Sequence, residues 1–250
     1  MPGNAFAGAE LTIDLDAIAA NWLSLGTRLK QGAQAGTVVK ADAYGLGMAE
    51  VAPALHTAGY RDFFTASLDE AIELRAVLAH CRIAVFFGPP PGEAEEYTRH
   101  RLMPVLNDLG QIENWRAHAG GSGGDPAILH IDAGMSRLGL PPEEMAQLAA
   151  EPERLAGFPL ARLMSHMACF EEPAHPLNER QLREFKAALA ALRQLATGAE
   201  ASLANSSAIF MGEDYHFDLA RPGAALYGVN LPPRPPNSMA EVVRLKGKTL

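Results

Sequence analysis

Short apolar runs and amphipathic segments alternate along most of the chain. After residue 36, eight short runs rich in apolar, β-branched or aromatic residues have the length and character of buried strands. These runs cover residues 38–39, 63–66, 83–87, 104–106, 128–131, 160–164, 201–204 and 217–219. Segments with apolar residues three and four positions apart fill most of the intervals and predict helices. Strands that alternate with helices indicate a parallel sheet, and eight such units predict a closed (β/α)8 TIM barrel, which is an α/β fold.

Capping residues mark the starts of several predicted helices. Ser67 is followed three residues later by Glu70, which is the spacing of a capping box. Asn178 stands at the start of the clearest helical pattern, over residues 178–197, and can cap it. Asp16 can cap the first helix in the same way. These signals support the division of the chain into strand and helix units.

The two ends of the chain depart from this alternation. Residues 11–15 alternate apolar and polar and predict a short half-buried strand. Residues 230–239 contain four prolines, a composition typical of stiff linkers, and residues 241–246 then resume a strand-like pattern. We therefore expect a barrel domain over residues 1–230. Residues 231–250 are expected to form a proline-rich linker and the first strand of a C-terminal β domain that is truncated here.

Composition and charge exclude several classes of protein. With 250 residues, of which 48% are apolar, the chain can bury a large core. The net charge is −8, and basic residues do not cluster with aromatic ones, so nucleic acid is not an expected partner. We find no apolar run of about 20 residues and no leader-like N-terminus, which predicts a cytoplasmic protein without membrane contact. Cys81 and Cys169 are isolated, so neither a disulfide nor a metal site is expected.

A lysine ends the first strand of the predicted barrel. Residues 37–38 begin an apolar, β-branched run that stops at Lys40, and Tyr44, Gly45 and Gly47 follow within seven residues. A buried ammonium is costly unless the site uses it, and desolvation makes the neutral amine available to attack a carbonyl. The alternative interpretation is that this lysine extends to water from a strand end.

Other reactive side chains also follow predicted strands. In a (β/α)8 barrel the C-terminal strand ends converge on one face, and the loops after strands seven and eight commonly bind phosphate. The residues placed there are Arg137, His166, Asn205, Ser206, Arg221 and Gly223. Individually, His166 could be a structural histidine, and Arg137 could anchor a loop. Together with Lys40 they indicate a phosphorylated aldehyde cofactor, pyridoxal 5′-phosphate (PLP), with a guanidinium as a partner for its pyridine nitrogen.

Five stretches of the sequence resemble motifs of the alanine racemase family, in the order that the family has them. They are residues 38–47, 132–139, 165–167, 204–207 and 221–228. The resemblance covers the barrel, from about residue 11 to residue 230. The lysine motif and the Arg-Pro-Gly motif are specific in combination. The resemblance implies a TIM barrel, PLP as cofactor and a small amino acid as substrate.

The resemblance also implies a role for each matching residue. Lys40 would hold PLP as a Schiff base and then act as a base on one face of the substrate. Arg137 would position the substrate carboxylate. His166 would lie near the cofactor ring, and Arg221 would hydrogen-bond the pyridine nitrogen. The other residues assigned to cofactor binding, most of them at the phosphate, are Tyr44, Asn205, Ser206, Gly223 and Ala224.

The sequence departs from the family at three positions, and the resemblance implies a catalytic group that we do not find. His130 stands where many members have a lysine that can be carbamylated, so no carbamate is expected. Asp42 and Leu46 replace an asparagine and a histidine, which we expect to be tolerated. In the family, a tyrosine from the second domain of a partner subunit is the second base of a homodimer. We expect little or no racemase activity from this chain without it.

The resemblance predicts a PLP-dependent racemase that interconverts L-alanine and D-alanine for peptidoglycan precursor supply. Two alternative hypotheses also involve PLP: a barrel that only carries PLP, and another PLP barrel enzyme such as an amino-acid decarboxylase. Arg221 fits a decarboxylase poorly, because that reaction needs a strong electron sink. A fourth reading is a phosphosugar barrel without PLP, in which Lys40 is incidental.

Overall fold

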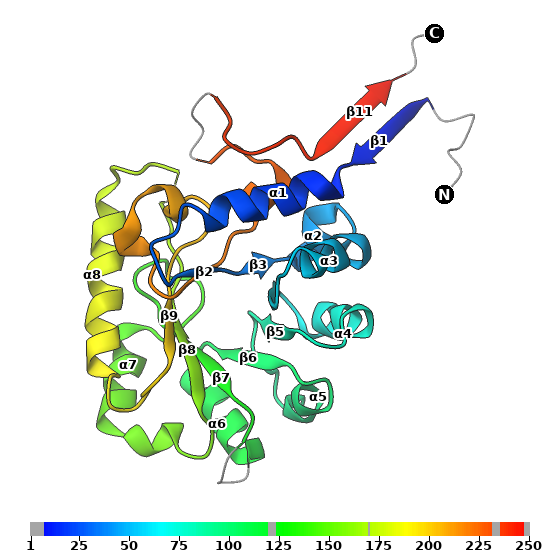
Figure 1. Ribbon diagram of the computed structural model, residues 1–250. Helices are drawn as coiled ribbons and strands as arrows, with labels where there is room; N and C mark the ends of the chain where they lie inside the picture. The colour runs from blue at the N-terminus through cyan, green and yellow to red at the C-terminus, as the bar shows by residue number, and fades with distance from the viewer. Residues whose placement is uncertain (1–7, 120–123, 170, 232–235, 248–250) are drawn as a thin grey trace.

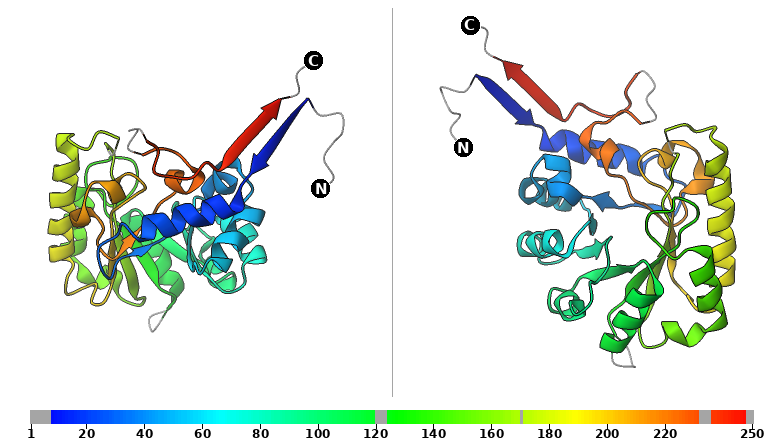
Figure 2. Two further views of the ribbon diagram at one scale, coloured as in Figure 1. Left: turned by 45° about the horizontal axis from the view of Figure 1, so that its top comes forward. Right: turned by 180° about the vertical axis from the view of Figure 1, so that it is seen from behind.

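The structure is a computed structural model that describes residues 8–119, 124–169, 171–231 and 236–247. Figure 1 shows a ring of strands with helices around its outside, and Figure 2 shows the same arrangement from two other directions. A pair of strands, β1 (Ala9–Ile13) and β11 (Val243–Gly247), projects away from the ring. In the described part of the chain, we find no helix with the length and apolar character needed to span a membrane.

Seven strands form a parallel sheet in which spatial order follows chain order. Each strand pairs with the next along the chain, and helical segments return the chain between most pairs. The strands are β3 (Thr37–Val38), β4 (Asp62–Thr65), β5 (Arg82–Val85), β6 (Met103–Leu106), β7 (Ala127–His130), β8 (Leu160–Met164) and β9 (Glu200–Ser202). Most of their residues are buried, as expected for strands that are covered by helices outside and by other side chains inside.

The short strand β10 (Leu219–Ala220) closes the ring between β9 and the start of the sheet. On one side, the N–H groups of Asp218 and Arg221 donate to the carbonyls of Ala201 and Ala204, at 3.0 and 2.8 Å. On the other side, β10 pairs in parallel with β2 (Gln34–Ala35), the segment that runs into β3. The predicted (β/α)8 barrel is therefore confirmed, and its eight predicted strands correspond to β3 through β10.

Helices surround the barrel because their apolar stripes pack on the outside of the strands. In α3, the residues at positions 48, 51, 52 and 55 are buried, which is the i, i+3, i+4, i+7 pattern of a core-facing helix. The helices are α1 (Leu15–Gly26), α2 (Lys40–Gly45), α3 (Met48–Thr57), α4 (Leu68–Val77), α5 (Ala94–Arg99), α6 (Leu109–Ala119), α7 (Pro142–Ala150) and α8 (Pro176–Ala191). Short 3-10 turns cover Pro152–Leu155, Ala208–Phe210, Glu213–Tyr215 and Ala224–Tyr227.

Two predicted caps were assigned to the wrong residue. Helix α1 begins two residues earlier than expected, and Asp14 rather than Asp16 accepts from the N–H of Ala17, at 2.9 Å. Helix α8 begins at Pro176, so Asn178 lies inside its first turn. The Asn178 side chain donates instead to the carbonyls of residues 169 and 172 and holds the loop after β8. In both places the spacing of capping residues predicted the wrong first residue of the helix, because the start of a helix also depends on how the preceding segment packs.

The projecting ribbon joins the two ends of the chain. Strand β1 (Ala9–Ile13) pairs antiparallel with β11 (Val243–Gly247), and both figures show the ribbon leaving the barrel beside α1. The expected strands near residues 11–15 and 241–246 are thus both present, although the first begins earlier than predicted. Most of the ribbon is exposed, including Leu245 at 70%. Of the proline-rich segment, residues 232–235 lie outside the described part of the chain, as do residues 248–250.

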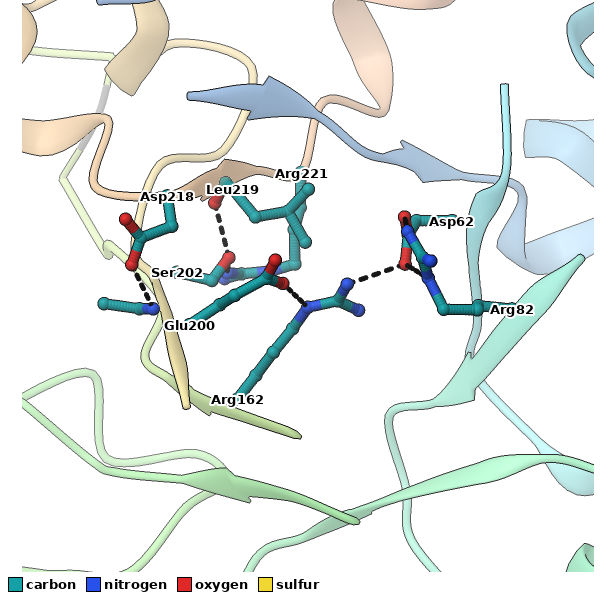
Figure 3. A network of polar contacts seen from close by, with 9 residues as sticks. Asp62, Arg82, Arg162, Glu200, Ser202, Asp218, Leu219 and Arg221 are labelled. Atoms are coloured by element: carbon teal, nitrogen blue, oxygen red, sulfur yellow. Dashed lines mark hydrogen bonds and ion pairs between the residues drawn. The ribbon is translucent and has the colours of Figure 1, made fainter. Parts of the chain in front are cut away.

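A chain of ion pairs lies among the N-terminal ends of the strands, opposite the face on which the predicted site residues gather. Figure 3 shows Asp62 of β4 between Arg82 of β5 and Arg162 of β8, with Glu200 of β9 on the far side of Arg162. The Arg162 guanidinium lies 2.7 Å from a carboxylate oxygen of Asp62 and 2.7 Å from one of Glu200. The Asp62 and Arg162 side chains are only 5% and 6% exposed. The network therefore ties four strands together at this end of the barrel.

Candidate active site

All nine residues predicted for the site border one cavity of about 450 Å³, which lies at the C-terminal ends of the barrel strands. They are Lys40, Tyr44, Arg137, His166, Asn205, Ser206, Arg221, Gly223 and Ala224. A neighbouring cavity of about 410 Å³ shares four lining residues with the first, namely Lys40, Phe86, Arg137 and His166. We treat the two as an outer and an inner lobe of one hollow. The barrel thus gathers side chains that are far apart in the sequence.

Lys40 reaches the hollow from the end of β3. Its Nζ lies 5.9 Å from the centre of the Tyr44 ring. Burial, and then the positive charge of Arg137, lower the pKa of the Lys40 amine, while the negative charge of Glu70 raises it. The net pKa is lowered, so more of this amine is neutral at a given pH than for a lysine in water. A neutral amine next to a cavity is a nucleophile for carbonyl groups.

The backbone that follows Lys40 turns in the left-handed sense. Residues 41–44 have φ values of 52°, 53°, 54° and 58°, although none of them is glycine. For L-residues this conformation costs about 1–2 kcal/mol each, so the surrounding structure must hold it. Ala43 is completely buried, and the Asp42 carboxylate accepts from the N–H of Met48 at 2.6 Å. The side-chain oxygen of an asparagine could accept the same hydrogen bond, so an aspartate can take the place of an asparagine at position 42.

Hydrogen-bond donors gather at the other end of the outer lobe. The Ser206 hydroxyl accepts from the N–H groups of Gly223 and Ala225, at 3.0 and 3.1 Å. The Tyr44 ring packs on Tyr227, with 4.9 Å between ring centres. A Cβ atom on Gly223 would lie 2.9 Å from Cζ of Tyr44 and closer still to its hydroxyl oxygen. Two hydroxyls beside a glycine-containing turn form an arrangement that suits a phosphate.

Arg221 is a buried guanidinium whose hydrogen-bond partners are neutral. It donates to the Ser202 hydroxyl, as Figure 3 shows, and to the carbonyl of Ser165 at 2.5 Å. Burial, and then the charge of Arg162, lower the pKa of Arg221 to about 9. The group is therefore still positive at neutral pH. Because it also borders the cavity, it can donate a hydrogen bond to a neutral acceptor there.

Two histidines near Arg221 are held in the neutral form. Burial, and then the charges of Arg221 and Arg137, lower the pKa of His166 well below its usual value and that of His130 to about 3. His130 Nδ1 lies 2.8 Å from Oδ1 of Asn107, whose amide nitrogen donates to two backbone carbonyls. The Asn107 oxygen must then be the acceptor, so His130 carries its proton on Nδ1 and leaves Nε2 as an acceptor.

Arg137 is carried by a loop that folds around Asp132. One oxygen of this carboxylate accepts from the N–H groups of Gly134, Met135 and Ser136, at 2.9, 2.9 and 3.0 Å. Gly134 and Ser136 both have positive φ, which lets three successive N–H groups point at one oxygen. Asp132 thus sets the path of the loop that presents Arg137, a function that the sequence reasoning did not assign to it.

The sequence reasoning missed the apolar residues of the hollow. The inner lobe is lined by Ala66, Phe86, Phe87, Leu138 and Met164 in addition to the polar groups. Apolar residues at strand ends have the same pattern as core residues, so only their position after predicted strands could have indicated them. Phe86, at the end of the predicted run 83–87, is the clearest such case, and it stacks on Phe64 with 5.4 Å between ring centres.

The donor set of the hollow suits an organic anion rather than a metal ion. Lysine, arginine, serine and backbone N–H groups provide positive charge and donors, whereas metal ions need acceptor ligands. Within the described residues, no group of three histidine, cysteine, aspartate or glutamate side chains is arranged to hold a metal ion.

Comparisons with known proteins connect this geometry to one family. Residues 13–231 match the family model described as "Alanine racemase, N-terminal domain". The chain is 50% identical over 246 residues to an alanine racemase of Rhodospirillum rubrum, covering 98% of this chain and 65% of that protein. It is 46% identical over 222 residues to an alanine racemase of Rhizobium meliloti, covering 89% and 57%.

A solved structure shares the fold over almost all of the chain. The crystal structure of alanine racemase from Bartonella henselae with covalently bound pyridoxal phosphate aligns with a TM-score of 0.89 and 38% identity. The alignment covers 96% of this chain and 66% of that one. The chain thus spans about 57–66% of the length of these relatives.

Proposed function

The chain belongs to the alanine racemase family, and we propose that it binds PLP covalently through Lys40 and forms the cofactor-binding part of an enzyme that interconverts L-alanine and D-alanine. The observation that carries the proposal is the shared hollow, in which an amine of lowered pKa faces the Ser206–Gly223 donors and the Arg221 guanidinium. The product would supply peptidoglycan precursors, and we place the reaction in the cytoplasm.

The residues present fit the chemical groups of PLP. The hydroxyls of Tyr44 and Ser206 and the backbone of Gly223 and Ala224 would surround the phosphate, and the lack of a Cβ on Gly223 makes room for the Tyr44 hydroxyl. Arg221, which borders the hollow, would donate to the pyridine nitrogen. Because its guanidinium stays positive, it opposes protonation of that nitrogen, since two cations would then face each other.

The chain's own groups would move the substrate proton and hold the substrate carboxylate. When bound, the cofactor supplies an electron sink that makes the Cα proton of the amino acid acidic. Nζ of Lys40 would accept that proton on one face of the substrate, because its lowered pKa leaves more of the amine neutral and able to take up a proton. The Arg137 guanidinium pairs with the substrate carboxylate, a geometry that arginine favours.

The opposite face of Cα needs a second proton donor. Tyr44 is the one tyrosine among the described residues that line the hollow, and its hydroxyl lies against Gly223 at the phosphate end. We assign the second base to a tyrosine of a β domain contributed by the partner subunit of a homodimer. Residues 231–250 and the β1–β11 ribbon would begin that domain.

One experiment separates the candidate reactions. In D2O with PLP, we expect the 250-residue chain to exchange the Cα proton of one alanine enantiomer and to invert it far more slowly, because Lys40 serves only one face. Proton NMR measures the exchange, and chiral chromatography measures the inversion. Rapid inversion would show that the second base lies within this chain. Loss of CO2 instead of exchange would indicate a decarboxylase, and PLP capture at Lys40 without exchange would indicate a carrier.

The phosphate end gives a second expectation. The substitution Gly223→Ala should weaken PLP binding by about 10–100-fold, because the new Cβ displaces the Tyr44 hydroxyl and a hydrogen bond to a charged group contributes about 1.5–3 kcal/mol. Titration of the chain with PLP measures the affinity. Gly26→Ala is the matched control, since a Cβ there meets nothing within 4 Å. Adding Tyr44→Ala to Gly223→Ala should lower the PLP affinity little further, because both changes remove the same contact. Additive losses of affinity would contradict this explanation.

A further inference from the structure

We propose that Glu70 is a positioning residue for Lys40, because its carboxylate ties the left-handed turn after Lys40 to the end of the neighbouring strand β4. The contact is a property of the fold. Its consequence for PLP rests on the function proposed above, so the test below also includes a measurement without the cofactor.

The Glu70 carboxylate bridges two strand ends from outside the hollow. Its Oε1 accepts from the N–H of Ala41, at 2.7 Å, and its Oε2 accepts from the N–H of Ala66, at 2.8 Å. Ala41 follows Lys40 directly, and Ala66 follows β4. Hydrogen bonds to an ionised carboxylate are stronger than those between neutral groups. A single side chain of α4 therefore sets the distance between the ends of β3 and β4 where the lysine begins.

The turn after Lys40 needs such an anchor at its entrance. Ala41 is the first of the four non-glycine residues with left-handed φ, a conformation that L-residues do not keep on their own. Farther along, the turn is held by the N–H of Ala43 on the Val39 carbonyl and by Asp42 on Met48. At Ala41, the acceptor that the structure provides is Glu70. Without it, this end of the turn can relax and redirect the Lys40 side chain.

Helix capping does not explain where the Glu70 carboxylate lies. The Ser67 hydroxyl accepts from the N–H of Glu70 at 3.4 Å, so the first half of the predicted capping box is present. In a complete box the glutamate would return to the N–H of Ser67. Here the carboxylate instead bonds Ala66 and Ala41, and the second bond spans 29 positions of the sequence. The Glu70 carboxylate of α4 therefore stabilises the strand ends beside the hollow rather than the start of its own helix.

The charge of Glu70 provides a second effect that can be measured separately. Within the described residues, the titratable and charged groups that border the hollow with Lys40 or bond its turn are Glu70, Tyr44, His130, Arg137, His166, Glu171 and Arg221. Of these, Arg137 lowers the pKa of the Lys40 amine and Glu70 raises it. Removing the Glu70 charge should therefore shift the pH midpoint of amine reactivity downward. Loss of the turn geometry should slow the reaction at every pH.

The test compares Glu70→Gln and Glu70→Asp with Asp69→Asn in the 250-residue chain. Asp69 shares the first turn of α4 and is exposed, so its variant changes the helix-end charge without touching the bridge. Capture of PLP at Lys40 is followed by borohydride trapping and peptide mass mapping across pH. Glu70→Gln should slow capture by roughly tenfold or more and lower its pH midpoint. Glu70→Asp should slow capture but keep the midpoint, because it keeps the charge and shortens the bridge.

Hydrogen exchange provides the measurement that does not depend on PLP. The amides of Ala41 and Ala66 should be protected in the unaltered chain and in Asp69→Asn and lose protection in Glu70→Gln. If Glu70→Gln matches Asp69→Asn in capture rate, pH midpoint and amide protection, the positioning role is wrong. If the unaltered chain does not capture PLP at Lys40, the proposed function fails instead, and the exchange data alone decide the role of Glu70.

Discussion

Replacing Lys40 by alanine is expected to abolish covalent capture of PLP by this chain. Of the lysines in the described part of the chain, Lys40 alone borders the hollow. Its amine has a lowered pKa because it is buried and faces Arg137. Borohydride reduction after incubation with PLP should therefore label one peptide in the unaltered chain and none in the variant, as read by mass spectrometry.

Non-covalent binding should survive this substitution. The donors for the phosphate come from Ser206, Gly223 and Tyr44, which other strand ends position, so the Lys40→Ala chain should still bind PLP weakly and release it on addition of inorganic phosphate. Lys186→Ala is the matched control, because Lys186 is exposed on α8. A stoichiometric label that persists in Lys40→Ala, or disappears in Lys186→Ala, would place the reactive amine elsewhere.

Replacing Asp62 by alanine is expected to lower the free energy of unfolding by about 3–5 kcal/mol, because one member of a buried ion-pair network is removed. In the variant, Arg162, with a side chain only 6% exposed, loses its ion pair with Asp62 and keeps the one with Glu200. Denaturant unfolding followed by circular dichroism measures the loss. Arg99→Ala is the comparison, because the Arg99 and Glu95 side chains are 57% and 74% exposed and such pairs contribute about 0–1 kcal/mol.

The cost of Asp62→Ala should depend on pH. Burial acts to raise the pKa of the Asp62 carboxyl, but the hydrogen bond from Arg82 and the charges of Arg162 and Arg82 outweigh it, and the pKa is lowered. A carboxyl with a lowered folded-state pKa stabilises the fold fully above its unfolded value, about 3.9, and less as pH falls through the folded value. The difference between the unaltered chain and the variant should therefore be full at pH 7 and shrink below about pH 4. A difference independent of pH would mean that packing, not charge, causes the loss.

Much of the barrel and the membership of the site could be predicted because both depend on local pattern. Eight buried runs separated by helical segments determine a closed parallel sheet, and parallel strands bring their C-terminal ends to one face. Lys40, His166 and Arg221 could then be placed together without any knowledge of their distances. The family motifs strengthened this assignment by matching at the same strand ends.

The capping residues of α1 and α8 could not be predicted from local spacing. Asp16 and Asn178 had suitable spacing, yet the helices begin earlier because the chain enters them from a ribbon and from a loop packed on the barrel. The apolar lining of the inner lobe was missed for a related reason. Phe86 and Met164 have the same composition signal as any core residue, and only the closed barrel shows that they border a hollow.

The amino-acid sequence by itself determined the barrel, its strand order and the set of reactive residues at its mouth, because hydrophobic periodicity acts between near neighbours. The tertiary structure alone decided the left-handed turn after Lys40, the Glu70 bridge to it, the proton position on His130 and the ion pairs around Asp62. Each of these depends on partners that lie far apart in the chain, such as Glu70 and Ala41 or Asp62 and Arg162. Such contacts exist only after the barrel has closed, so no local pattern encodes them.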